Sequence, residues 1–226
     1  MTDLDALIRL CPPPNPPMTI DWSEVEADVG SGPPDDYKAL AERYGPGTFC
    51  DYLTLYHPHG PTEYVNLTGP MPERVRARLR TDYDRGTHPV AHDPDHLFAC
   101  GVTSNGEYLF WITEPASEPD SWQVAVNEAR GPLWYAHHGT ITNFLVSVLT
   151  GQIQVPQFPV GLLQSPPVFT PSHPVLIKPE PDDAPPPPPV DAAVIRTWAR
   201  EHGHPVPTRG RIPPNTLKVW ETAHRH

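Results

Sequence analysis

The sequence is poor in cysteine and has no long apolar run. Its three cysteines, at positions 11, 50 and 100, include no pair with CxxC spacing. This argues against a disulfide framework or a zinc finger and favours a reducing compartment. Residues 1–10 lack the apolar core of a signal peptide, and no 18 consecutive apolar residues are present to cross a membrane. We therefore expect a cytoplasmic protein without membrane contact.

Catalytic motifs are also missing. The sequence has no GxSxG, no phosphate-binding glycine loop and no Cys/His pair suited to nucleophilic catalysis. The segment His92-Asp93-Pro94-Asp95-His96 offers metal-ligand chemistry. However, it lies in a proline-containing loop without a distant cysteine partner, so a metal site is the less favoured interpretation. We expect a protein that is not an enzyme and needs no cofactor.

Basic residues are scarce overall but unevenly distributed. The formal net charge is −11, which argues against a generally basic nucleic-acid binder. Residues 191–226 hold six basic and three acidic residues, a balance of +3, so residues 1–190 carry −14. Charges of opposite sign in two segments indicate two separate roles.

Proline is abundant: it makes up 34 of the 226 residues, whereas it makes up roughly 5% of an average chain. Residues 156–190 hold 13 prolines, including five in succession at 185–189. Each ring restricts φ and removes a backbone donor, so this segment is predicted to be an extended, semi-rigid linker. A ligand for a proline-reading domain is the alternative. Residues 1–16, which also contain a proline run, are predicted to be an irregular lead-in.

Residues 17–155 mix helical and strand patterns and predict an α+β domain. Helices are expected at 22–29, 34–44, 71–82 and 141–150, and strands at 49–56, 97–102, 107–113, 122–126 and 133–136. Asn105-Gly106 predicts a tight hairpin turn, because positive φ is favoured at such a dipeptide. The tryptophans at 111, 122 and 134 lie on expected strands and are interpreted as core residues.

Four arginines, at 74, 76, 78 and 80, lie on the helix expected at 71–82. They form two neighbouring stripes and offer a second DNA-binding patch. Acidic residues at 73, 82 and 84 adjoin them in an acidic domain, which favours a solvated helix face instead.

Residues 191–226 predict a helix, a loop and a second helix, close to the lower size limit for independent folding. Asp191 is expected to cap the first helix and Gly203 to end it, and Ile212-Pro213 to begin the second. The residues expected to pack between the helices are Val194, Ile195, Trp198, Ala199, Leu217, Trp220 and Ala223.

The loop contains Arg209-Gly210-Arg211, a tripeptide that suits the minor groove of DNA. The groove is about 6 Å wide, narrower in A-tracts, and presents only acceptors at A·T pairs. A guanidinium is planar, always charged and weakly hydrated, so it enters this groove at low desolvation cost. The glycine lets the backbone approach the groove floor, while the amine of guanine would obstruct it. The chemistry therefore predicts a preference for A·T pairs.

The surroundings of this tripeptide resemble a known family. Residues 194–204 (VIRTWAREHGH), Val206 and residues 208–213 (TRGRIP) are similar to the C-terminal DNA-binding domain of the actinobacterial histone-like nucleoid-structuring (H-NS-like) family. Those proteins are xenogeneic silencers that coat AT-rich DNA. The resemblance implies that Arg209, Gly210 and Arg211 enter the groove, that Thr208 supports the loop or meets the backbone, and that Arg196 binds a flanking phosphate. The small dimerisation domain with which those silencers begin has no counterpart here.

Residues 20–153 carry a second, more diffuse resemblance. Its motifs are WxxVE at 22–26, PxxYKxL at 34–40, YGxGxF at 44–49 and the late helix after Thr140. They look like the SUKH superfamily, which is α+β and includes many bacterial immunity proteins. This resemblance implies a protein-binding module and assigns no site residues.

These features together predict an AT-preferring, minor-groove DNA binder of the nucleoid that regulates transcription. Residues 17–155 would self-associate or bind a protein partner. Two alternatives remain open. The chain is an immunity or antitoxin-like protein whose tail only localises it, or the tail binds protein, as the small subunit-binding domains of acyltransferase complexes do.

Overall fold

The computed structural model describes residues 2–13, 16–30, 32–86, 89–172, 192–207 and 212–223. The chain divides into two compact units, Met1–Val175 and Leu176–His226. The first unit is described in this subsection, and the second in the next.

The first unit is built on a seven-stranded antiparallel sheet with the strand order β6-β5-β4-β3-β2-β1-β7. The strands are β1 (Gly47–Phe49), β2 (Leu53–Leu55), β3 (Leu97–Thr103), β4 (Tyr108–Ile112), β5 (Gln123–Asn127), β6 (Trp134–His137) and β7 (Phe169–Pro171). Neighbours in the chain pair through β-hairpins from β3 to β6, whereas β7 pairs with the distant β1. The predicted α+β class is confirmed.

Five α-helices accompany the sheet. They are α1 (Asp3–Leu10), α2 (Trp22–Val29), α3 (Asp35–Tyr44), α4 (Met71–Arg85) and α5 (Ile141–Leu149), with short 3₁₀ helices η1 (Pro94–His96) and η2 (Pro119–Ser121). The Asp21 carboxylate caps α2, and the Thr140 hydroxyl caps α5. Gly30 ends α2 in the left-handed conformation at φ 79°. The expected helices and their main boundary signals are confirmed.

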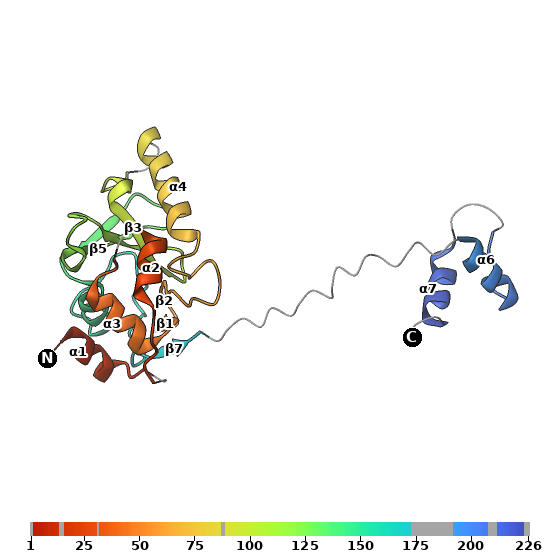
Figure 1. Ribbon diagram of the computed structural model, residues 1–226, viewed down its shortest axis with the longest axis horizontal. Helices are drawn as coiled ribbons and strands as arrows, with labels where there is room; N and C mark the ends of the chain where they lie inside the picture. The colour runs from red at the N-terminus through yellow and green to blue at the C-terminus, as the bar shows by residue number, and fades with distance from the viewer. Residues whose placement is uncertain are drawn as a thin grey trace. The chain divides into compact units, whose positions relative to one another are not determined.

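The helices lie on both faces of the sheet. On one face, Tyr37 of α3 meets Trp111 of β4 edge to face at 4.9 Å. Phe144 of α5 meets His137 of β6 at 5.5 Å on the same face. Strand side chains alternate, so Tyr108 and Trp134 lie on the opposite face, where α4 lines a cavity with them. Figure 1 shows α4 apart from α1 and α3. The core therefore has two layers, one on each side of the sheet.

The segment expected as a single strand at 49–56 is instead a tight hairpin of β1 and β2. Cys50 and Asp51 have φ of 52° and 50°, in the left-handed region. The backbone N–H of Tyr52 then donates to the carbonyl of Phe49. The apolar pattern continues through the turn, because Cys50 is half-buried, so periodicity alone does not reveal the reversal.

The predicted hairpin of β3 and β4 is confirmed, but its turn is of a different type from the one expected. Only Gly106 has positive φ, at 95°, whereas Asn105 does not. The N–H of Gly106 and the carbonyl of Glu107 both bond to the backbone of Thr103, which closes a three-residue loop. The buried Glu107 carboxylate accepts from the hydroxyls of Thr103 and Tyr52 and so secures the loop.

The predicted irregular lead-in at 1–16 is wrong for residues 3–10, which form α1. Thr2 and Asp5 form a capping box at its start. Leu7 and Cys11 are fully buried, and α1 packs on α5 and α3. The Tyr44 hydroxyl donates to the Cys11 carbonyl at 2.6 Å, which ties the proline run to the core. The helix is therefore an integral part of the first unit.

The predicted boundary at residue 155 also needs correction. Phe158 and Phe169 are buried in the core. Phe169, in β7, lies 5.0 Å from the ring of Tyr44 and 4.9 Å from that of Phe49. Pro171 does not prevent β7 from pairing with β1. Because β7 is the edge strand, the missing N–H of Pro171 faces the side of β7 on which no other strand lies. The rest of the predicted linker, residues 173–190, lies outside the described residues.

Among the described residues, every helix is too short or too polar to span a bilayer.

We expect stability to fall in mild acid because of His57. Its Nδ1 accepts from the backbone N–H of His59 at 2.9 Å, so Nε2 carries the proton and donates to the Ala41 carbonyl. Burial lowers the pKa of His57 to about 4, from 6.5 for an exposed histidine. The unfolded chain therefore binds a proton first, and unfolding free energy is lost as pH falls from 6.5 towards 4, by up to about 3 kcal/mol.

Urea unfolding at several pH values measures this effect. His57→Gln should flatten the pH dependence over that window, and His59→Gln should leave it in place. An unchanged slope in the His57 variant would contradict the assignment.

Candidate nucleic-acid interface

The second unit contains two helices, α6 (Ala192–Glu201) and α7 (Pro214–Ala223), which contact each other. Among its described residues, Ile195, Ala199 and Thr216 are buried. Ile195 and Ala199 are four residues apart, so both lie on one stripe of α6. The predicted pair of helices is confirmed, and its core is small.

The inner face of α7 differs from the one predicted. Leu217 is 37% exposed and Ala223 is exposed, whereas Thr216 is buried and Trp220 is partly buried. Thr216 and Trp220 are four residues apart and lie on one stripe of α7, which is the more buried one, and Leu217 lies to its side. On α6, Val194 is 54% exposed and also lies outside the core.

Two histidines stack on Trp198 where α6 ends. The rings of His202 and His204 lie 4.6 Å and 5.6 Å from the Trp198 ring, each inclined by 20°. Gly203 turns the chain between them with φ of 74°. The N–H of His204 donates to the carbonyl of Ala199 at 2.7 Å. This corner fixes the direction in which the chain leaves α6 towards the loop.

The residues predicted to contact DNA lie mostly in that loop. Thr208, Arg209, Gly210 and Arg211 lie outside the described residues, as does the predicted cap Asp191. Arg196 is described and lies half-buried on α6. Two further basic residues, Arg200 of α6 and Lys218 of α7, are exposed. The described helices thus flank the loop with basic side chains, which sequence reasoning did not single out apart from Arg196.

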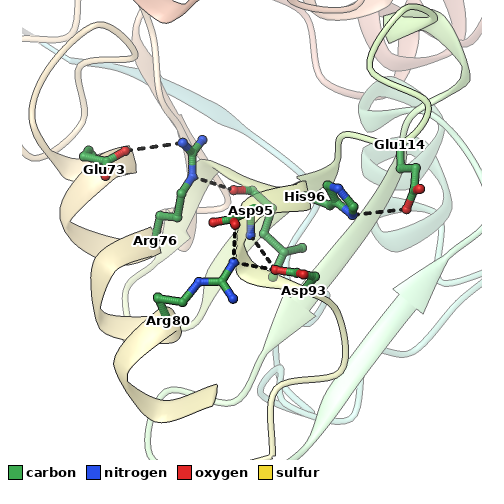
Figure 2. Close-up of polar contacts among 8 residues, drawn as sticks. Glu73, Arg76, Arg80, Asp93, Asp95, His96 and Glu114 are labelled. Carbon is green, nitrogen blue, oxygen red and sulfur yellow. Dashed lines mark hydrogen bonds and ion pairs between the residues drawn. The ribbon is translucent and has the colours of Figure 1, made fainter. Parts of the chain in front are cut away.

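Three arginines of α4, Arg74, Arg76 and Arg80, form ion pairs within the first unit. Arg74 contacts Glu63 at 3.4 Å, and Arg76 contacts Glu73 at 3.3 Å. Arg76 also donates to the carbonyl of Leu97 (Figure 2). Partners of opposite charge thus accompany Arg74 and Arg76, as expected of a solvated helix face. The geometry gives no support to a second DNA-binding patch on α4.

The segment with metal-ligand chemistry faces the same helix. Arg80 lies 2.5 Å from a carboxylate oxygen of Asp93 and 2.5 Å from one of Asp95 (Figure 2). The backbone N–H of Asp95, assisted by Arg80, lowers the pKa of Asp93. His96 contacts Glu114 at 3.2 Å instead of joining the carboxylates. Arg80 thus fastens η1 to α4, and the contact with Glu114 joins η1 to the residues after β4, which is a structural role.

Comparison with known proteins identifies the second unit. Residues 187–223, about a sixth of the chain, match the family model of the Lsr2 DNA-binding domain. This confirms the resemblance of residues 191–226 to the C-terminal domain of the actinobacterial H-NS-like family. The matched domain binds DNA and is not enzymatic, which supports a DNA-binding, nucleoid-associated protein. Neither a curated protein nor a solved structure shows a significant match to the chain.

Proposed function

We propose that this protein binds AT-rich double-stranded DNA of the nucleoid by placing Arg209, Gly210 and Arg211 in the minor groove. The observation that carries the proposal is the match of residues 187–223 to a DNA-binding domain. The match covers both described helices and the loop between them. A tail that binds protein is the less favoured function, because nothing in the match points to a protein ligand.

The chemistry of the loop supports the minor groove over the major groove. Arg209 and Arg211 extend in opposite directions along the groove floor, and Gly210 allows the backbone to lie close to it. The negative potential of the groove deepens as it narrows, so the guanidinium groups bind best in A-tracts. In G·C pairs, the guanine amine occupies the same space.

Flanking contacts hold the helices on the duplex. Arg196 of α6 binds a phosphate beside the groove, and Thr208 supports the loop or contacts the sugar-phosphate backbone. Such contacts fix orientation without reading sequence. Arg196, Arg200 and Lys218 together give the second unit a basic surface in an otherwise acidic chain.

The first unit is proposed to bind protein, as a SUKH-like module. Helices α2, α3 and α5 lie where the motifs of that resemblance occur. One small DNA-binding unit with few phosphate contacts binds weakly alone. Linking several units on one DNA raises the affinity by roughly 10²–10⁴-fold. A protein-binding module that links several chains therefore allows the weakly binding tails to occupy DNA, as silencing of AT-rich regions requires.

A binding series on AT-rich and GC-rich duplexes tests the proposal. The full chain should prefer the AT-rich duplex, and a drug that occupies the minor groove should compete. With about three to four phosphates neutralised, the log–log slope of affinity against salt should be about −3. Equal affinity for both duplexes at low salt, or indifference to the drug, would exclude the groove model.

A further inference from the structure

One part of the first unit has no charged side chains at all. Residues 1–175 contain nine basic and 21 acidic residues, a formal charge of −12, and every one of them lies in residues 1–130. Residues 131–177 contain no Asp, Glu, Lys or Arg. At the chain's overall frequency of 19%, a stretch of this length would hold about nine. Burial explains this for α5, but residues 151–168 are mostly exposed.

Apolar side chains project from this uncharged segment. The first unit has six large exposed hydrophobic residues among those described, and four lie here: Leu133, Val160, Leu163 and Val168. Val160 is fully exposed at the tip of a turn, in which the N–H of Leu162 donates to the carbonyl of Pro159. Grouped exposed apolar side chains mark interaction surfaces.

This turn forms part of the wall of a groove. It has a volume of about 310 Å³ and is lined by residues 148–163, among them Val148, Ile153, Val155 and Phe158. Val155 and Phe158 also belong to the core, so the base of the groove is held in place by core packing. We call the groove and the turn, residues 148–168, the uncharged face. The uncharged face therefore has both a projecting apolar side chain, Val160, and an apolar groove.

We propose that the uncharged face is the contact between two copies of this chain. Two copies that each carry −12 on the first unit repel wherever their charged surfaces meet. The uncharged face contributes no Asp, Glu, Lys or Arg to such a contact, so its own residues set no like charges against each other. In a two-fold contact the same patch serves both copies, so Val160 of each copy enters the groove of the other. Interfaces between identical chains are also typically more apolar and less charged than other surfaces.

The dimer would supply the self-association that the proposed function needs, and in that respect the inference rests on it. Two DNA-binding tails per particle allow simultaneous contact with two sites on one duplex. The geometry of the face, however, does not depend on what the tail binds, so the two proposals can fail separately.

Mass in solution, measured without DNA by sedimentation on the full chain, tests the inference. The wild type should have twice the 25.1 kDa of one chain at high concentration. Added salt should not dissociate the dimer, because no ion pair holds it. Val160→Asp places two carboxylates in the contact and should weaken the dimer at least about 100-fold. Tyr64→Asp, on an exposed hydrophobic residue of the charged part, is the control and should remain dimeric.

Circular dichroism should show that both variants fold, since each side chain is exposed. A monomeric wild type at every concentration, or a dimer that Val160→Asp leaves intact, would overturn the inference. On a short duplex with one site, Val160→Asp should bind as the wild type does, and on long AT-rich DNA it should bind more weakly. A wild type that forms the dimer but shows no preference for AT-rich DNA would refute the proposed function alone.

Discussion

Replacing Arg209 and Arg211 together by alanine should lower affinity for AT-rich DNA by about 100-fold or more and abolish the preference over GC-rich DNA. Each guanidinium makes charged hydrogen bonds in the groove, worth about 1.5 kcal/mol or more. The two together contribute about 3 kcal/mol, which corresponds to about 100-fold in affinity. Fluorescence anisotropy with one duplex of each composition measures both effects.

Two matched variants separate groove binding from simple charge. Arg200→Ala with Lys218→Ala removes the same charge from the exposed surface of α6 and α7. It should weaken binding to both duplexes alike and keep the preference. Arg209→Lys with Arg211→Lys retains the charge but not the planar donor group, so the preference should shrink. If the double alanine variant at 209 and 211 still discriminates the duplexes, these arginines do not read the groove.

Leu7→Ala should lower the free energy of unfolding of the first unit by about 2–5 kcal/mol. Leu7 is fully buried where α1 packs on α3 and α5. Truncating a buried leucine removes its apolar contacts and leaves a cavity, which accounts for a loss of this size. Urea unfolding followed by tryptophan fluorescence measures the loss, because Trp111 and Trp122 report on the same core.

Arg9→Ala, at an exposed position of the same helix, is the control. It should change the free energy of unfolding by about 0.5 kcal/mol or less, the usual effect of a surface substitution. Similar small effects for both variants would mean that α1 contributes little to the fold, contrary to the packing described above.

Local signals in the sequence predicted most elements of the first unit. Thr140 and Gly151 bracket α5, and Gly30 ends α2, because caps and left-handed glycines act within one turn of the helix. The hairpin around Gly106 was also predicted, although its exact turn was not. In the second unit, the sequence located both helices and singled out the loop that carries Arg209 and Arg211.

The candidate site was predicted as a set of residues, and its surroundings required the structure. The stack of His202 and His204 on Trp198 depends on the turn at Gly203 and could not be derived from spacing. The buried stripe of α7 was misassigned in part: Trp220 belongs to it as predicted, but apolar character favoured Leu217 over Thr216. Small helix pairs bury few residues, so the helix phase is only weakly encoded in hydrophobicity.

Charge distribution, helix caps and the chemistry of Arg-Gly-Arg were determined by the sequence itself, since each depends on residues close together in the chain. Only the tertiary structure decided that residues 3–10 and 156–172 belong to the first unit. Their stability comes from distant partners: Leu7 packs where α1 meets α5, and Phe169 packs on Tyr44 and pairs with Phe49. Proline-rich sequence around both segments signals loops locally, and it is burial against residues more than a hundred positions away that overrides this signal.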